Sequence, residues 1–346
     1  MDNVARMLPV FAIVALAACH APTSVSTPRS LPEFEAHLEQ LRQDKNIPGM
    51  SAVIADGQHV MWSRGYGFAN VAQQIPATDT TAFHLASLTK TFASTIIMQL
   101  VEAGQLDLDA PVANFGIALS SPGTIRVRHL LTHTSGGTPG SSFLYDGDRF
   151  GLLDQVIQRV TNESFAQRVT DVILTPLRLP HTAPNILNST AFAFSGLDAD
   201  AFRKNLAQGY SSDGRMPIPY PNSFGTAAGM VASAIDVASY SMAIDRNAFL
   251  RPETQALAFT AAVSTNGQTL PYGLGWFVQT INGVKLQWHY GWWTGNSSLI
   301  IRVPERGLVF ILLANTDALS AGTRLGFGDL LSSPAARAFL DAFVFR

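Results

Sequence analysis

Strand-like runs lie at both ends of this chain, and a long helix-rich stretch separates them. Residues 50–55 and 59–66 flank a Gly-containing turn, which is typical of a β-hairpin. Four more runs, 272–280, 284–290, 297–303 and 308–315, follow near the C-terminus, and the segment 291–296 is expected to be a loop between two of them. The pattern predicts an α+β fold, with a sheet lobe over about 31–85 and 265–346, a helical lobe over about 86–264, and a cleft between them.

Three helices are predicted most clearly around this insert. Apolar residues recur at helical spacing over 32–44, and the same periodicity runs from Ser87 until Gly104 ends it. A final helix is expected over 334–343. The chain therefore opens and closes with a helix, and a third helix begins at the edge of the insert.

Length, composition and net charge favour a large folded domain and argue against nucleic-acid binding. With 346 residues, of which 47% are hydrophobic and 14% charged, the chain can bury a large core without a disulfide or a metal ion. The net charge is -2, and the Lys and Arg residues are dispersed, so no nucleic-acid partner is expected. A small-molecule or peptide-like substrate is the expected partner.

The N-terminus is predicted to carry a targeting signal. Residues 7–18 form an apolar run behind Arg6 that is too short to span a bilayer and is typical of a signal peptide. The run ends Leu-Ala-Ala-Cys19, which resembles the bacterial lipoprotein box, so residues 1–18 are expected to be removed and Cys19 lipidated. An ordinary signal-peptidase site at residues 15–17 is the alternative, and Cys19 is the only cysteine.

A flexible tether over 19–30 then precedes a folded domain over 31–346. The tether is rich in Pro, Ser and Thr and has no apolar periodicity. These features predict a periplasmic protein attached by lipid to a membrane, the outer rather than the inner one.

The sequence Ser87-Leu88-Thr89-Lys90 contains a serine and a lysine at the spacing that an acyl-transfer reaction can use. A serine hydroxyl is a poor nucleophile near neutral pH, and a lysine one helical turn later can help to remove its proton. Chance produces such a match in about one chain of this size in three or four, so a solvated serine and an exposed lysine are the alternative. The motif alone therefore does not distinguish an acyl-transfer site from two surface residues, and other segments of the sequence are needed.

Three ordered segments follow this motif. Residues 129–136 read His-Leu-Leu-Thr-His-Thr-Ser-Gly, residues 139–147 include Tyr145-Asp146-Gly147, and His289-Tyr290-Gly291 ends a strand-like run. Together with Ser87-x-x-Lys90, they resemble the serine β-lactamase and penicillin-binding-protein superfamily, in its branch of class C β-lactamases, D-Ala-D-Ala carboxypeptidases and carboxylesterases. The resemblance runs from about residue 47 to residue 316 and implies the fold of that superfamily.

The resemblance also implies roles for individual residues. It makes Ser87 the nucleophile, Lys90 its activator, and Tyr145 the general base, as a phenolate whose pKa Lys90 would lower strongly. A loop aromatic that packs on the core is the alternative for Tyr145. The family reaction implies no cofactor.

On the C-terminal strand, the resemblance gives His289 and Gly291 the positions of the Lys/His-x-Gly motif. The backbone N–H groups of Ser87 and Trp292 would then form the oxyanion hole. His289 is alternatively a packed strand histidine. His129 and His133 are four residues apart, but the Glu of a His-Glu-x-x-His zinc site is missing, so both are expected to be structural and no metal is expected.

Two departures from the family pattern bear on the substrate. Gly147 stands where the family has an Asn that contacts the substrate amide, and Asp146 is the adjacent candidate to replace that contact. His289 replaces a lysine, and a mostly neutral histidine binds a substrate carboxylate more weakly. A small carboxylic ester is therefore the expected substrate; a β-lactam or a D-amino-acid peptide is the alternative, and a penicillin-binding or cell-wall-binding protein with little turnover is the alternative of another class.

Overall fold

A seven-stranded antiparallel sheet joins the two ends of the chain in the computed structural model, which describes residue 28 and residues 30–345. The strand order is β3-β2-β1-β12-β11-β10-β9. The strands are β1 (Gly49–Ala55), β2 (Val60–Asn70), β3 (Ile75–Pro76), β9 (Phe277–Ile281), β10 (Val284–Trp293), β11 (Asn296–Val303) and β12 (Leu308–Ala314). The first and last long strands pair directly, from Met50 opposite Ala314 to Ala55 opposite Val309, which confirms the predicted α+β architecture. The predicted signal peptide and Cys19 lie outside the described residues.

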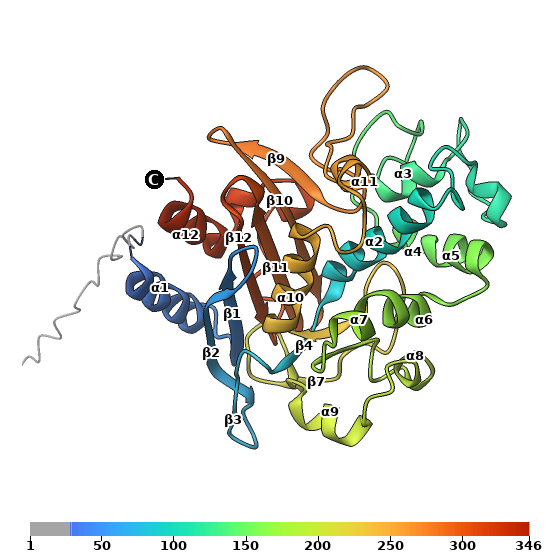
Figure 1. The fold of residues 1–346 in the computed structure, drawn as a ribbon. Coiled ribbons are helices and arrows are strands. Elements are labelled where there is room, and N and C mark those ends of the chain that lie inside the picture. The colour runs from blue at the N-terminus through green and yellow to red at the C-terminus, as the bar shows by residue number, and fades with distance from the viewer. Residues whose placement is uncertain (1–27, 29, 346) are drawn as a thin grey trace, which may run out of the picture.

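Helices cover both faces of this sheet (Figure 1). On one face, α1 (Leu31–Asp44) packs beside α12 (Pro334–Phe343), and Phe34 makes an edge contact with Phe310 of β12 at 5.5 Å between ring centroids. On the other face, α10 (Ala234–Asp245) packs against β1 and β12. Because both faces are covered, β1 is buried along its whole length, and its side chains alternate between the two cores.

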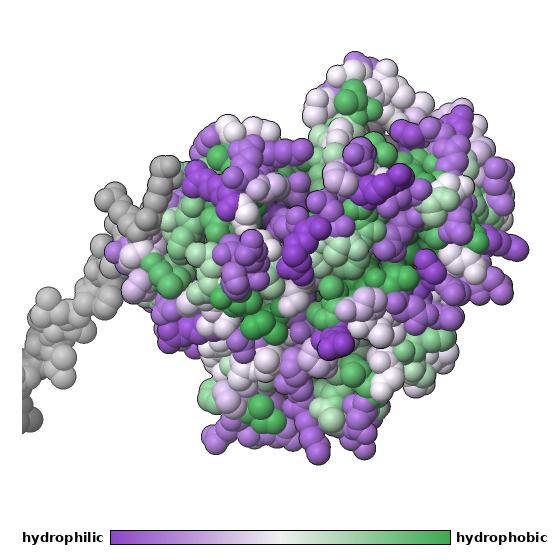
Figure 2. All heavy atoms as spheres, viewed as in Figure 1, coloured by the Kyte–Doolittle hydropathy of each residue, from purple (hydrophilic) through white to green (hydrophobic). Residues whose placement is uncertain are grey.

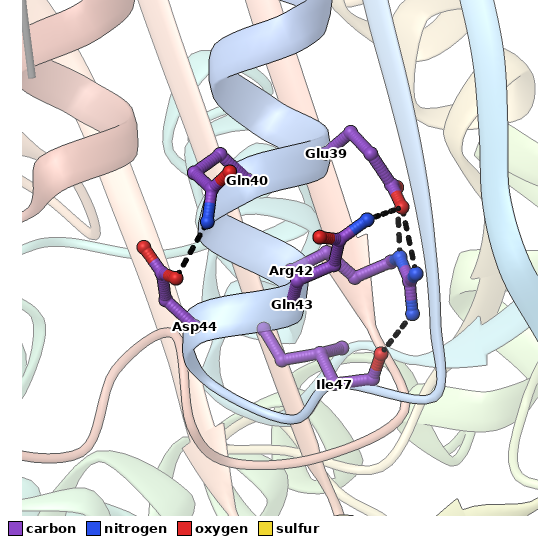
Figure 3. Close-up of polar contacts among 6 residues, drawn as sticks. All are labelled: Glu39, Gln40, Arg42, Gln43, Asp44 and Ile47. Atoms are coloured by element: carbon purple, nitrogen blue, oxygen red, sulfur yellow. Dashed lines mark hydrogen bonds and ion pairs between the residues drawn. The ribbon is translucent and has the colours of Figure 1, made fainter. Parts of the chain in front are cut away.

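The end of α1 is fixed by polar contacts (Figure 3). Arg42 donates two hydrogen bonds to the Glu39 carboxylate, at 2.8 and 2.7 Å, and a third to the backbone oxygen of Ile47 at 2.9 Å. Gln40 donates to Asp44 at 2.7 Å on the other side of the helix. These bonds close the turn that leads from α1 into β1.

The insert consists of short helices around one long buried helix, α2 (Thr89–Glu102). The other elements are α3 (Val127–Leu131), α4 (Gly147–Gly151), α5 (Leu153–Thr161), α6 (Phe165–Val169), η3 (Thr170–Leu174), α7 (Thr175–Leu177), α8 (Ser189–Ala193), α9 (Ala199–Asn205), α11 (Pro252–Ala258), and the short strands β4 (Ala82–His84), β5 (Thr182–Ala183), β6 (Gly209–Tyr210), β7 (Pro217–Ile218) and β8 (Val231–Ser233). The strands β4, β8 and β5 form a small second sheet. Since α2 is buried on nearly all sides, its first turn is held rigidly between the two parts of the molecule.

Three local predictions differ from the structure. The expected strand 272–280 begins only at Phe277, and the expected loop 291–296 shortens to Thr294 and Gly295, because Trp292 and Trp293 pair with Ser297 and Asn296 in the ladder of β10 and β11. The helix expected at Ser87 starts as a 3-10 turn, η1 (Ala86–Leu88), before α2.

The helices of the described residues fall short of the length and hydropathy that a membrane span requires. None of the helices there is long and apolar enough to cross a bilayer. Hydrophilic and hydrophobic residues are interspersed over the face drawn in Figure 2.

Candidate active site

The turn η1 presents Ser87 from a strained backbone. Ala86, the residue before it, has φ = +48°, which L residues other than Gly, Asn and Asp rarely adopt. Its N–H donates to Nδ1 of His84 at 3.1 Å, and its oxygen accepts from the Thr89 hydroxyl at 2.7 Å. These two bonds hold the turn, so that the half-buried Ser87 side chain is fixed at its apex.

Lys90 lies one turn further on and contacts Ser87 directly. Its Nζ atom donates to Ser87 Oγ at 3.1 Å and to the backbone oxygen of Ala227 at 2.7 Å. The ammonium also lies 5.2 Å from the ring centroids of Tyr145 and Phe150. The predicted pairing of Ser87 with Lys90 is therefore present, and the lysine is fully buried rather than exposed.

Burial changes the chemistry of this lysine. Removal from water lowers the pKa of Lys90 to about 7, although the charges of Asp146 and Asp148 oppose the shift. A pKa near 7 leaves about half of the side chain as a neutral amine at neutral pH. A neutral amine in contact with a serine hydroxyl can accept its proton.

Tyr145 does not have the electrostatics that the sequence predicted. Its ring stacks on His133 at 4.3 Å between centroids, and its buried hydroxyl lies near the Ser87 hydroxyl. Burial raises its pKa well above the usual range, the neighbouring Tyr290 adds to this, and the Ser87 hydroxyl opposes it. The raised pKa does not favour the predicted phenolate, and the role of Tyr145 as the general base stays a prediction.

Gly291 brings β10 against the nucleophile turn. A Cβ atom on Gly291 would overlap the backbone oxygen of Leu85 and would lie 3.0 Å from the Ala86 side chain. Ser298, its partner on β11, donates to the same Leu85 oxygen at 2.7 Å. Only glycine permits this approach, which places the strand beside η1.

The edge of β10 that follows is not covered by its neighbour. The pairing of β9 with β10 ends at Trp288 opposite Phe277, before β10 passes η1. Trp292 continues the strand one residue beyond Gly291. The arrangement is compatible with the predicted oxyanion hole of Ser87 and Trp292 N–H groups, and that role stays a prediction.

His289 is buried, and both of its ring nitrogens form hydrogen bonds within the protein. Its Nδ1 contacts the backbone oxygen of Tyr290 at 2.7 Å, and its Nε2 contacts the Tyr272 hydroxyl at 2.8 Å. A carbonyl oxygen can only accept, so Nδ1 carries the proton and Nε2 accepts from Tyr272. Burial and then the charge of Lys90 lower the pKa of His289 to about 3, so the ring is neutral and orients Tyr272.

Asp146 and Gly147 lie at the start of α4. Asp146 Oδ1 accepts from the Arg149 N–H at 2.9 Å, which caps the helix, and its own N–H donates to His133 Nδ1 at 3.0 Å. The Asp146 carboxylate is therefore engaged with the helix. A Cβ atom on Gly147 would lie 3.8 Å from Lys90 Nζ, so an Asn side chain at this position would begin beside the lysine.

Three partners of the site were missed by the sequence prediction. They are the Ala227 oxygen, the Tyr272 hydroxyl and His84. The only signal for Ala227 was the small-residue run 225–229, and nothing in the run indicated that a carbonyl would face Lys90. Tyr272 appeared in the sequence only as the start of an expected strand.

The two histidines considered as metal ligands are used by the backbone. His129 Nδ1 accepts from the Arg126 N–H at 3.1 Å, and His133 Nδ1 accepts from Asp146. Among residues 28 and 30–345, no group of three or more His, Cys, Asp or Glu side chains is placed to hold a metal ion.

Comparisons with known proteins agree with this geometry. The family model described as Beta-lactamase matches residues 34–327. The chain is 25% identical to Protein flp of Staphylococcus aureus (strain MW2), over 83% of this chain and 63% of that protein, so it spans less than two thirds of that relative's length.

Two solved structures share the fold. The class C beta lactamase from Rhodobacter sphaeroides superposes with a TM-score of 0.71 at 21% identity, covering 89% of this chain and 97% of that chain. EstCE1, a hydrolase with promiscuous acyltransferase activity, superposes with a TM-score of 0.70 at 22% identity, covering 90% of this chain and 98% of that chain.

Proposed function

The chain belongs to the Beta-lactamase family, and on this basis we propose that it is a serine hydrolase that forms an acyl-enzyme on Ser87 and cleaves small carboxylic esters. The observation that carries the proposal is the 3.1 Å contact between Ser87 Oγ and a buried Lys90 whose pKa is lowered to about 7. The two groups form a nucleophile and a base in direct contact.

In the acylation step, neutral Lys90 takes the proton of Ser87 as Oγ bonds to the ester carbonyl carbon. The carbonyl oxygen becomes an anion, which the N–H groups of Ser87 and Trp292 are proposed to stabilise. The carbon–oxygen bond to the alcohol then breaks, and the alkoxide leaves with the proton that Lys90 received. The products are the acyl-enzyme, a neutral alcohol and neutral Lys90.

In the deacylation step, water hydrolyses the acyl-enzyme, and Lys90 again acts as the base. Lys90 accepts a proton from water as the oxygen attacks the acyl carbon, and returns it to Ser87 as the acid leaves. Tyr145, protonated and beside Ser87, is proposed to relay protons or to position them rather than to act as a phenolate. Its ring also holds the Lys90 ammonium.

Gly147 supports an ester over an amide substrate. The position faces Lys90 but carries no side-chain amide to bind a substrate amide group. The loss of one such hydrogen bond is worth about 1.5–3 kcal/mol, or about one to two decades of rate. Neutral, internally bonded His289 also offers no charge to a substrate carboxylate.

The test compares three substrates on one protein. The domain from residue 31 is offered a short-chain p-nitrophenyl ester, a chromogenic cephalosporin and a D-Ala-D-Ala peptide, with Ser87→Ala as the inactive variant and Ser142→Ala, an exposed serine, as its matched control. We expect ester turnover in the wild type and in Ser142→Ala, and none above background in Ser87→Ala.

Other outcomes favour other functions. Rapid cephalosporin or peptide turnover with poor ester turnover would make the protein a β-lactamase or a carboxypeptidase. A stable penicilloyl adduct in intact-mass spectra without turnover would make it a penicillin-binding protein. Full activity in Ser87→Ala would remove the mechanism altogether.

We also propose that Cys19 is lipidated and tethers the domain to a membrane on its periplasmic side. The support is the segment ending Leu-Ala-Ala-Cys19 behind an apolar run. Labelled palmitate should enter the full chain expressed in a bacterium and should not enter Cys19→Ser. Label in Cys19→Ser, or its absence from the wild type, would contradict the tether.

A further inference from the structure

A cavity of about 570 Å³ lies in the helical lobe, away from Ser87. It is bounded by α5, α6, α8 and the segment that precedes Gly225. Phe165 and Phe224 form one wall as a stacked pair, 5.4 Å apart with an angle of 15° between the rings, and Phe194 stands exposed at the edge. The hollow therefore offers a flat aromatic surface of the kind that binds small apolar groups.

Asp154 places a carboxylate in this apolar lining. Its Oδ1 atom accepts from the Thr226 N–H at 2.9 Å, and a Cβ atom on Gly225 would overlap Oδ2, so the carboxylate lies tightly against this segment. Arg159 also lines the cavity, but no Arg, Lys or His of the described residues forms an ion pair with Asp154, and burial raises its pKa to about 6. At neutral pH the cavity thus contains a carboxylate that no protein cation contacts directly.

The same segment leads directly to the active site. Thr226 binds Asp154, and the next residue, Ala227, accepts the hydrogen bond from Lys90 Nζ at 2.7 Å. The Thr226 hydroxyl also donates to the backbone oxygen of Phe150, whose ring lies under the lysine. Two hydrogen bonds and the peptide link from Thr226 to Ala227 therefore connect the Asp154 carboxylate with Lys90.

We propose that this cavity is a second ligand site, which takes a small molecule with an ammonium group on an aromatic body, and that its occupation weakens the hold of Ala227 on Lys90. The ammonium pairs with Asp154, and the aromatic body packs on Phe165 and Phe224, where a cation gains further from the ring faces. The binding stands apart from the proposed hydrolysis, whereas the effect on Lys90 rests on it. Pairing with the ligand draws the carboxylate away from Thr226, so occupation lowers kcat and leaves KM unchanged.

The binding test uses 2-phenylethylammonium and its uncharged analogue 2-phenylethanol. Calorimetric titration is done on the Ser87→Ala domain, so that the result does not depend on hydrolysis, in that background alone and with Asp154→Asn, Thr190→Trp or Asp171→Asn added. Thr190 is an exposed residue of the cavity rim, and a Trp there would fill the hollow without altering the core. Asp171→Asn removes an exposed charge elsewhere in the lobe and is the matched control.

We expect one site for the amine, binding about tenfold tighter than the alcohol, lost in Asp154→Asn and in Thr190→Trp and kept in Asp171→Asn. Thermal melts show whether each variant is folded. If Asp154→Asn does not fold, the loss of amine binding in Thr190→Trp alone tests the site. Equal binding in Thr190→Trp and in the parent, or equal binding of amine and alcohol, would overturn the site.

The coupling is tested on the active enzyme with the p-nitrophenyl ester. A severalfold fall in kcat at constant KM, absent in Thr190→Trp, supports it. Competition of the amine with the ester would place the amine in the active site and overturn the proposal, and unchanged kinetics at saturating amine would overturn the coupling.

Discussion

Replacement of Lys90 by methionine is expected to abolish activity and to stabilise the fold at the same time. The lysine is fully buried, and its pKa falls from an ordinary 10.5 to about 7. Each pKa unit corresponds to about 1.4 kcal/mol, so the lysine costs the folded state about 4 kcal/mol at pH 7. Methionine has a similar length and no charge to bury, but it leaves the Ala227 oxygen without its donor, at a cost of about 1–3 kcal/mol.

The net expectation at pH 7 is a gain of about 1–3 kcal/mol in the free energy of unfolding for Lys90→Met. Between about pH 7 and pH 10.5 the unfolded chain binds more protons at Lys90 than the folded chain does, so wild-type stability rises with pH over this range. At pH 9 the cost of the buried lysine is about 2 kcal/mol, so the advantage of the variant shrinks by about 2 kcal/mol from its value at pH 7.

The assay is denaturant unfolding of both proteins at pH 7 and pH 9, with Lys285→Met as the matched control on an exposed lysine of β10. The control should leave the pH dependence of the wild type unchanged. A stability difference between Lys90→Met and the wild type that is the same at both pH values would refute the reasoning, since Lys90 would then keep its proton and could not serve as the base.

Three further predictions concern catalysis. The value of kcat/KM for a p-nitrophenyl ester should rise with pH through about 7, as Lys90 loses its proton, and a rate that is flat from pH 5.5 to 8.5 would contradict this. Gly147→Asn should raise cephalosporin or peptide turnover relative to ester turnover by about one to two decades, because its side chain begins 3.8 Å from Lys90 Nζ; an unchanged ratio in parallel assays would count against the role of this position. Gly291→Ala should lower ester kcat by at least about 100-fold, since its Cβ overlaps the Leu85 oxygen and displaces the turn of Ser87, whereas near-normal kcat would show that β10 need not approach so closely.

The fold could be predicted from the sequence because its signals are local. The helix at the start of the chain, the final helix and the strand runs all follow from apolar periodicity and turn residues. The sequence also placed both ends of the chain in one sheet lobe, but it did not predict that β1 pairs directly with β12. The differences arose where tertiary contact overrides local pattern, as at Gly291, which reads as a loop glycine and lies inside β10 because η1 packs on it.

In the candidate active site, too, the sequence predicted the local contact but not the effects of tertiary packing. The contact between Ser87 and Lys90 follows from helical spacing and is present. The pKa values depend on burial and on the atoms that each group faces, which no spacing reveals, so the protonated Tyr145 and the weakly basic Lys90 were not foreseen. The Ala227 oxygen reaches Lys90 from 137 residues away.

The direct pairing of β1 with β12 has a consequence for how the protein is made. A chain that grows from its N-terminus exposes residues 49–55 long before residues 308–314 exist to pair with them. The first hairpin must therefore wait, with an open strand edge, until residues 308–314 have been synthesised, and such a delay invites pairing with other chains. The strand that flanks the serine also arrives in this last stretch. A chain that ends before β10 would thus contain Ser87 and Lys90 without the wall that β10 provides, so hydrolytic activity should appear only after residues 284–293 have been synthesised.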